Sequence, residues 1–151
     1  MQTRRETLKQ SVAVAGLLGA TGLFPQSAWA FNKQAFEAKT IADAAKAYGA
    51  AAPVESKDVT LTAPDIAENG AVVPLAAAST IAGVKHLLLL VEKNPNALVA
   101  KFDVSDAIDA NVATRAKMGQ TSDVFAVAIT NDGKAFFAKK EVKVTLGGCG
   151  G

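Results

Sequence analysis

The run VKHLLLLVE at residues 84–92 constrains the fold more than any other stretch of the sequence. It is almost continuously apolar, and only Lys85 and His86 interrupt it before its final residue. An apolar run of this length is typical of a strand that is covered on both faces. We therefore expect a central, well-covered β-strand at this position.

Six further strands are predicted around this run, with no helical pattern between them. They are expected at residues 57–63, 71–79, 97–104, 111–118, 123–130 and 134–146. About seven strands in this arrangement favour a mainly β fold, an immunoglobulin-like antiparallel β-sandwich. A β-barrel is the alternative.

Turn residues separate the predicted strands. Asn131-Asp132-Gly133 is a strong hairpin signal. Pro64 begins a turn, and Asn69-Gly70 offers a corner that tolerates the left-handed conformation. Pro74 indicates an edge strand or a bulge in the segment that contains it.

One N-terminal helix is predicted before the strands, at residues 33–49. Its apolar residues recur at helical spacing, Asn32 is a suitable N-cap, and Gly49 is a suitable end. The apolar stripe is rich in alanine, so we expect this helix to lie on the surface of the domain and not in its centre.

The first 30 residues resemble an export signal. Arg4 and Arg5 precede an apolar run at residues 12–23, and Ala28-Trp29-Ala30 has the pattern of a cleavage site. That run is shorter than the roughly 20 residues of a membrane-spanning helix. TRRETLK is similar to the twin-arginine (Tat) motif, although Thr7 replaces the usual aromatic residue. We expect periplasmic export with cleavage after Ala30, by the Tat route or, as the alternative, the general secretory route.

Cleavage would change the charge of the protein. Loss of Arg4, Arg5, Lys9 and Glu6 reduces 16 basic and 14 acidic residues to 13 of each. The mature chain, residues 31–151, is then formally neutral, with no basic patch to indicate nucleic-acid binding and no membrane segment. We expect a single domain over residues 31–146.

Most familiar chemistry is missing. His86 is the only histidine, and one histidine with one distant cysteine makes a weak zinc site. No CxxCH motif for covalent haem is present. We expect no metal, no cofactor and a structural role for His86. Arg115, the only arginine of the mature chain, is expected to form a salt bridge, with anion binding as the alternative. The carboxylates of FDVSDAIDA at residues 102–110 are expected to form a solvated connection.

The only cysteine, Cys149, stands in GGCGG at residues 147–151. Glycine is the most costly residue to order, so Gly147, Gly148, Gly150 and Gly151 predict a flexible arm. A thiol on such an arm can receive a group in one active site and carry it to another. The alternative is an immunoglobulin-like binding or structural module whose tail cysteine forms an intermolecular disulfide.

Three segments carry a resemblance to a known family. VTLGGCGG at residues 144–151 matches a terminal carrier motif, and IAENGAVVPL at 66–75 is similar to a loop-and-strand segment of the same family. ATRAKMGQTSDVFAVA at 113–128 is similar to its strand pair before the last hairpin. With the leader, the chain resembles the SoxY family, the sulfur-carrier subunits of the thiosulfate-oxidising Sox system, over nearly its whole length.

The resemblance implies a carrier and not an enzyme. A SoxY protein forms a heterodimer with SoxZ and docks transiently with SoxAX, SoxB and SoxCD. The haem protein SoxAX joins thiosulfate to the carrier cysteine, SoxB releases sulfate, and SoxCD oxidises the remaining sulfur. Carried over to this sequence, Cys149 holds the sulfur intermediates as thiosulfonate and persulfide. A disulfide between two Cys149 residues would link two heterodimers.

Overall fold

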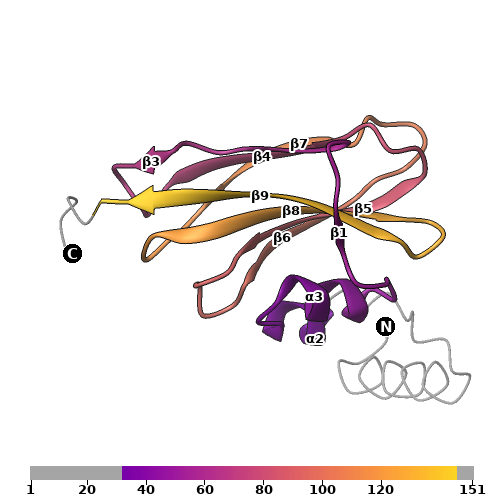
Figure 1. The fold of residues 1–151 in the computed structure, drawn as a ribbon, viewed down its shortest axis with the longest axis horizontal. Coiled ribbons are helices and arrows are strands. Elements are labelled where there is room, and N and C mark those ends of the chain that lie inside the picture. The colour runs from indigo at the N-terminus through magenta and orange to yellow at the C-terminus, as the bar shows by residue number, and fades with distance from the viewer. Residues whose placement is uncertain (1–31, 146–151) are drawn as a thin grey trace, which may run out of the picture. The chain divides into compact units, whose positions relative to one another are not determined.

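The computed structural model describes residues 32–145, and these residues form nine strands and two short helices (Figure 1). The chain divides into Met1–Phe31 and Asn32–Gly151. The predicted leader, residues 1–30, and the predicted arm, residues 147–151, lie outside the described residues.

The strands form two sheets that pack face to face. The larger sheet has the order β1-β9-β8-β5-β6, with β3 also pairing with β9, and the smaller sheet has the order β2-β4-β7. The larger sheet consists of β1 (Val54–Glu55), β3 (Ile66–Ala67), β5 (Val84–Val91), β6 (Leu98–Asp103), β8 (Ser122–Thr130) and β9 (Ala135–Val144). The smaller one consists of β2 (Val59–Thr62), β4 (Val73–Ser79) and β7 (Asn111–Ala116).

The helices α2 (Lys33–Glu37) and α3 (Ile41–Ala47) form a third layer, below the larger sheet in Figure 1. Strand β5 lies between β6 and β8 in the middle layer. Its side chains alternate: Leu87 and Leu89 belong to the core between the sheets, and Leu88 and Leu90 to the core beneath the helices. All four are fully buried. This double cover confirms the central strand that the apolar run predicts.

The single predicted helix at residues 33–49 is wrong, because two helices occupy this segment. Asn32 caps α2 as predicted, with its side chain accepting from the backbone N–H of Ala35. Ala38 then leaves the helical conformation at ψ 137°, and Thr40 caps α3 by accepting from the N–H of Asp43. A threonine followed three residues later by a carboxylate is a helix-start signal, and it divides the periodic pattern here.

All seven predicted strands are present, and the sandwich prediction is confirmed. Two additional short strands, β1 and β3, lie in segments that the sequence indicates as a helix break and a turn. Both pair in parallel with β9, as the only parallel pairs of the described residues. Pro74 lies in β4 beyond Ala76, where the pairing with β2 ends, so it has a strand neighbour on one side only. The sheet edge that Pro74 indicates therefore extends over only the first part of β4.

Candidate functional site

The predicted site residues Cys149, Gly147, Gly148, Gly150 and Gly151 lie outside the described residues. The structure describes the strand that leads to them. β9 ends at Val144, and the N–H of Thr145 donates to the carbonyl of Ala67 at 3.1 Å. The N–H of Val144 donates to Oγ1 of Thr121 at 3.0 Å. The chain at Val144 and Thr145 is thus held from two sides, and Thr145 is four residues before Cys149.

The segment at residues 64–72, here called the root loop, lies along the end of β9. Ile66 and Ala67 pair in parallel with Lys143 and Val144 (Figure 1). The N–H of Lys143 donates to the carbonyl of Asp65 at 3.0 Å. These backbone bonds attach the root loop to the last residues before the predicted arm.

Lys140 fixes the start of the root loop. Its ammonium group lies 2.8 Å from Oδ1 of Asp65 and donates to the carbonyl of Ala63 at 2.6 Å. The hydrogen bond from Lys140, with its positive charge and that of Lys143, lowers the pKa of Asp65 below its ordinary value. The carboxylate is exposed, so this contact contributes position more than stability.

Gly70 fixes the other part of the root loop by a close backbone approach. Its carbonyl accepts from the N–H of Met118 at 2.7 Å. A Cβ at Gly70 would lie 2.3 Å from the carbonyl oxygen of Met118 and 2.9 Å from Cγ1 of Val144. Gly70 does not use the left-handed conformation that the predicted corner would tolerate, since it is not among the glycines with positive φ. Glycine is required here by lack of space, while Asn69 does form a turn by accepting from the N–H of Ala71.

Two large apolar side chains of the root loop are exposed. Ile66 is 55% exposed and Val72 is 50% exposed. The only other large hydrophobic residues as exposed in residues 32–145 are Val54 and Ile108. Half of these exposed side chains therefore lie within one short loop beside the end of β9. Nothing in the sequence pattern singles them out, because exposure depends on how the loop folds back onto β9.

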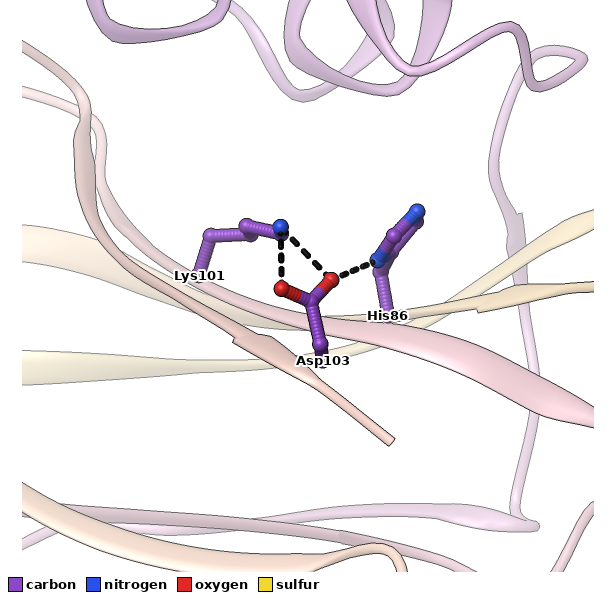
Figure 2. A network of polar contacts seen from close by, with 3 residues as sticks. All are labelled: His86, Lys101 and Asp103. Atoms are coloured by element: carbon purple, nitrogen blue, oxygen red, sulfur yellow. Dashed lines mark hydrogen bonds and ion pairs between the residues drawn. The ribbon is translucent and has the colours of Figure 1, made fainter. Parts of the chain in front are cut away.

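His86 belongs to a polar network under α3, shown in Figure 2. Its Nδ1 lies 2.7 Å from Oδ1 of Asp103, and the ammonium group of Lys101 lies 2.6 Å from the same carboxylate. The Tyr48 ring lies 5.4 Å from the His86 ring, and Lys101 lies 5.7 Å from the Tyr48 ring centre. Nδ1 of His86 is buried without a well-aligned hydrogen bond among the described residues.

Burial lowers the pKa of His86 because it disfavours the charged imidazolium, and the positive charges of Lys101 and Lys85 lower it further against the opposing effect of Asp103. The hydrogen bond from Lys101 lowers the pKa of Asp103. This network joins β5, β6 and the end of α3, so the structure places His86 in a packing role. Within residues 32–145 no group of three His, Cys, Asp or Glu side chains is arranged to hold a metal ion.

Arg115 lies exposed on β7, beside Pro74 of β4. It forms no salt bridge with any carboxylate in the described part of the chain, so the expected ion pair is wrong. Arg115 instead lines an open, mostly apolar groove of about 470 Å³ with Thr62, Pro64 and Ala113. Asp106 and Asp109 line a different opening of about 550 Å³, and Asp103 belongs to the His86 network.

Comparison with known proteins gives three findings. The family model described as "Sulfur oxidation protein SoxY" matches residues 44–149. The solved structure of the sulfur carrier protein SoxY from Chlorobium limicola f thiosulfatophilum is 37% identical, with a TM-score of 0.56. That match covers 62% of this chain and 86% of that chain. No curated protein sequence matches.

A second solved structure shows how widely the fold is shared. Superoxide reductase (neelaredoxin) from Ignicoccus hospitalis is 15% identical with a TM-score of 0.52. The match covers 58% of this chain and 80% of that chain. At this identity the likeness concerns the sandwich alone. Within residues 32–145 no helix has the combination of length and apolar character that crossing a membrane requires.

Proposed function

Because the chain belongs to the SoxY family of sulfur oxidation proteins, we propose that it is a periplasmic carrier that holds thiosulfate-derived sulfur covalently on Cys149. The observation that carries the proposal is the family match, which extends to residue 149 and so includes this cysteine. SoxY is a family of carrier proteins. In this proposal the protein presents the sulfur group on Cys149 to its partner enzymes and is not an enzyme itself.

The glycines around Cys149 support this role. Gly147, Gly148, Gly150 and Gly151 have no side chains, so a segment of this composition would fit the narrow channel of a partner enzyme. An exposed thiol with an ordinary pKa of about 8.5 is only about 3% thiolate near pH 7. The partner enzymes would therefore supply the activation, which keeps the carrier unreactive between visits.

The proposed chemistry balances on one thiol. Joining thiosulfate to Cys149 forms a sulfur–sulfur bond and gives Cys149–S–S–SO₃⁻. The thiol proton is released, and two electrons pass to the haem protein SoxAX. Hydrolysis by SoxB then breaks the bond between the outer sulfane sulfur and the sulfonate. Water supplies the fourth oxygen of sulfate, two protons leave, and Cys149 keeps a persulfide anion, Cys149–S–S⁻. SoxCD would oxidise the sulfur that remains.

Membership in the SoxY family implies partners in the Sox system. We assign SoxZ the role of stable partner in a heterodimer, and SoxAX, SoxB and SoxCD the role of transient partners. The formal neutrality of the mature chain is compatible with docking to several proteins in turn. No cofactor is assigned to this chain.

The test is the intact mass of the protein isolated from the periplasm of thiosulfate-grown cells, before and after dithiothreitol. The expected result is a chain without residues 1–30 that carries a reducible mass increase of a thiosulfonate or of extra sulfur atoms on Cys149. A chain found only as a Cys149-linked dimer, or only as a free thiol, would contradict the carrier function. In a reconstituted system, Cys149→Ser should bind SoxZ normally and abolish thiosulfate oxidation.

A further inference from the structure

We propose that Thr121 is a positioning residue of the carrier, because its hydroxyl group holds the end of β9 and so fixes where the arm begins. This inference rests on the proposed carrier function. It concerns the reach of the thiol of Cys149 and not the choice of partner enzyme.

Strand β9 runs past the end of its antiparallel partner β8. The last paired residues of the two strands are Ser122 and Val142, and β9 continues to Val144. Backbone N–H groups of alternate residues point to the same side of a strand, so that of Val144 points to the side of β8, as that of Val142 does. β8 has no residue paired with Val144, and its N–H donates to Oγ1 of Thr121 at 3.0 Å. A side chain thus replaces the missing bond of the ladder.

The root loop holds the opposite side of the same chain end. The N–H of Thr145 donates to the carbonyl of Ala67 at 3.1 Å, and the hydroxyl of Thr145 lies 3.5 Å from that carbonyl. Val144 and Thr145 are therefore bonded on alternate sides of the chain. The bond to Thr121 depends on a side chain of another segment, so a single substitution there removes it and leaves the backbone of the root loop unchanged.

Thr121 stands at the end of the loop between β7 and β8, and this loop is itself fixed. The side chain of Asn94 donates to the carbonyl of Lys117 at 2.8 Å, at the start of the loop. Ser122, which follows the loop, is buried, and its hydroxyl accepts from the N–H of Lys93 at 3.0 Å. The hydroxyl of Thr121 is therefore offered from a fixed backbone.

These contacts set the reach of the thiol. Cys149 follows Thr145 by four residues, which span at most about 14 Å when extended. Release of Val144 and Thr145 would move the last anchored residue to Lys143, and six residues span about 21 Å. A longer arm reaches further but brings the thiol to a given point less often, by about a factor of two for this change in length. The bond to Thr121 therefore limits the reach of the thiol and raises its local concentration.

The test combines Thr121→Val with a chain from which Leu146 is deleted. The deletion shortens the arm by one residue, so the sulfur group falls short of its position in the active site of SoxB. Each carrier is paired with SoxZ, loaded to completion by SoxAX with thiosulfate, and checked by intact mass. It is then mixed with excess SoxB, and the rate of sulfate release is measured at saturating enzyme. At saturation docking is complete, so the rate reports the arm.

The deletion should slow sulfate release about tenfold, because a misplaced reacting group loses rate steeply. Thr121→Val should then raise the rate of the shortened arm about fivefold, since the loss of one hydrogen bond shifts the opening of the chain end by about that factor. In the arm of normal length the same substitution should slow release by less than about twofold. A substitution that only destabilises the domain would not act in opposite directions on the two arms.

Two control variants isolate the role of the hydroxyl. Thr121→Ser keeps it and should leave both arms unchanged. Thr130→Val is the matched control at the far end of β8, where the hydroxyl of Thr130 donates to the carbonyl of Lys134 at 3.1 Å. It removes a threonine hydrogen bond away from the arm, so it should not restore the shortened arm. Hydrogen exchange of the Val144 N–H should be about fivefold faster in Thr121→Val and unchanged in both controls.

Three results would overturn the proposal and leave the carrier function intact. One is unchanged hydrogen exchange at Val144 in Thr121→Val. Another is a shortened arm that Thr121→Val does not accelerate. The third is full activity of the arm without Leu146, because reach would then not limit transfer. A Cys149→Ser chain that still becomes loaded and releases sulfate would instead contradict the carrier function and, with it, this inference.

Discussion

Gly70→Ala should destabilise the domain although it adds a single methyl group to an exposed loop. The new Cβ would lie 2.3 Å from the carbonyl oxygen of Met118 and 2.9 Å from Cγ1 of Val144. The first of these atoms belongs to the backbone, so rotation of a side chain cannot relieve the contact. The root loop must move away from Met118 and Val144, and the 2.7 Å hydrogen bond from the N–H of Met118 to the carbonyl of Gly70 must lengthen or break.

The magnitude follows from these two effects. Overpacking of this kind costs about 1–3 kcal/mol, and a lost backbone hydrogen bond adds about 1 kcal/mol. We expect the free energy of unfolding to fall by about 3 kcal/mol, which lowers Tm by roughly 12 °C for a domain of this size. The assay is urea unfolding at fixed temperature, followed by the far-UV circular dichroism of the sheets.

Gly119→Ala is the matched control, because a Cβ at Gly119 meets nothing within 4 Å. Its φ also lies outside the left-handed region, so alanine should be tolerated there with a change below about 0.5 kcal/mol. A loss below about 1 kcal/mol for Gly70→Ala, or equal losses for the two variants, would refute the close-approach explanation.

Three further predictions concern the core network, the arm and export. Burial lowers the pKa of His86 in the folded chain, so as pH falls the imidazole of the unfolded chain is protonated first. The free energy of unfolding should therefore fall as pH drops from about 6.5, the ordinary pKa of histidine, to the lower pKa of His86 in the folded chain. His86→Phe should flatten that acid-side decline in urea midpoints, and an unchanged decline would assign it to other groups. Gly147→Val with Gly148→Val should slow transfer with every partner enzyme by restricting the arm; unchanged rates would show that arm flexibility is irrelevant. Arg4→Lys with Arg5→Lys should leave precursor in the cytoplasm on immunoblots of cell fractions, whereas normal export would indicate the general secretory route.

The fold was predictable wherever local pattern and tertiary environment agree. The apolar run at residues 84–92 predicts a strand covered on both faces, and β5 is covered by the smaller sheet on the side of Leu87 and by the helices on the side of Leu88. The hairpin at Asn131-Asp132-Gly133 was also predictable, and Gly133 adopts φ 79° there. The periodicity of residues 33–49 predicts one helix, whereas the local cap at Thr40 divides the segment into two.

Other features could not be predicted because they depend on contacts between distant segments. The pairing of β3 with β9 joins residues 66–67 to residues 143–144, and two residues carry no strand pattern of their own. Arg115 was expected to form a salt bridge, but the register that places it beside Pro74 brings no carboxylate to it among the described residues. The role of Gly70 is similar: Asn-Gly predicts a corner, while the folded chain uses the glycine for close packing.

The sequence by itself determined the class of fold and the family, and it predicts the carrier residue and export, because each depends on a local pattern. Strand periodicity, the predicted export signal and Cys149 among four glycines can be recognised without knowing any contact between distant residues. Tertiary structure alone decided what surrounds the start of the arm. Ile66 lies in a predicted turn and Val72 in a predicted strand, and neither pattern places them. They are exposed beside the end of β9 because the root loop is hydrogen-bonded to that strand and packed against Met118 and Val144.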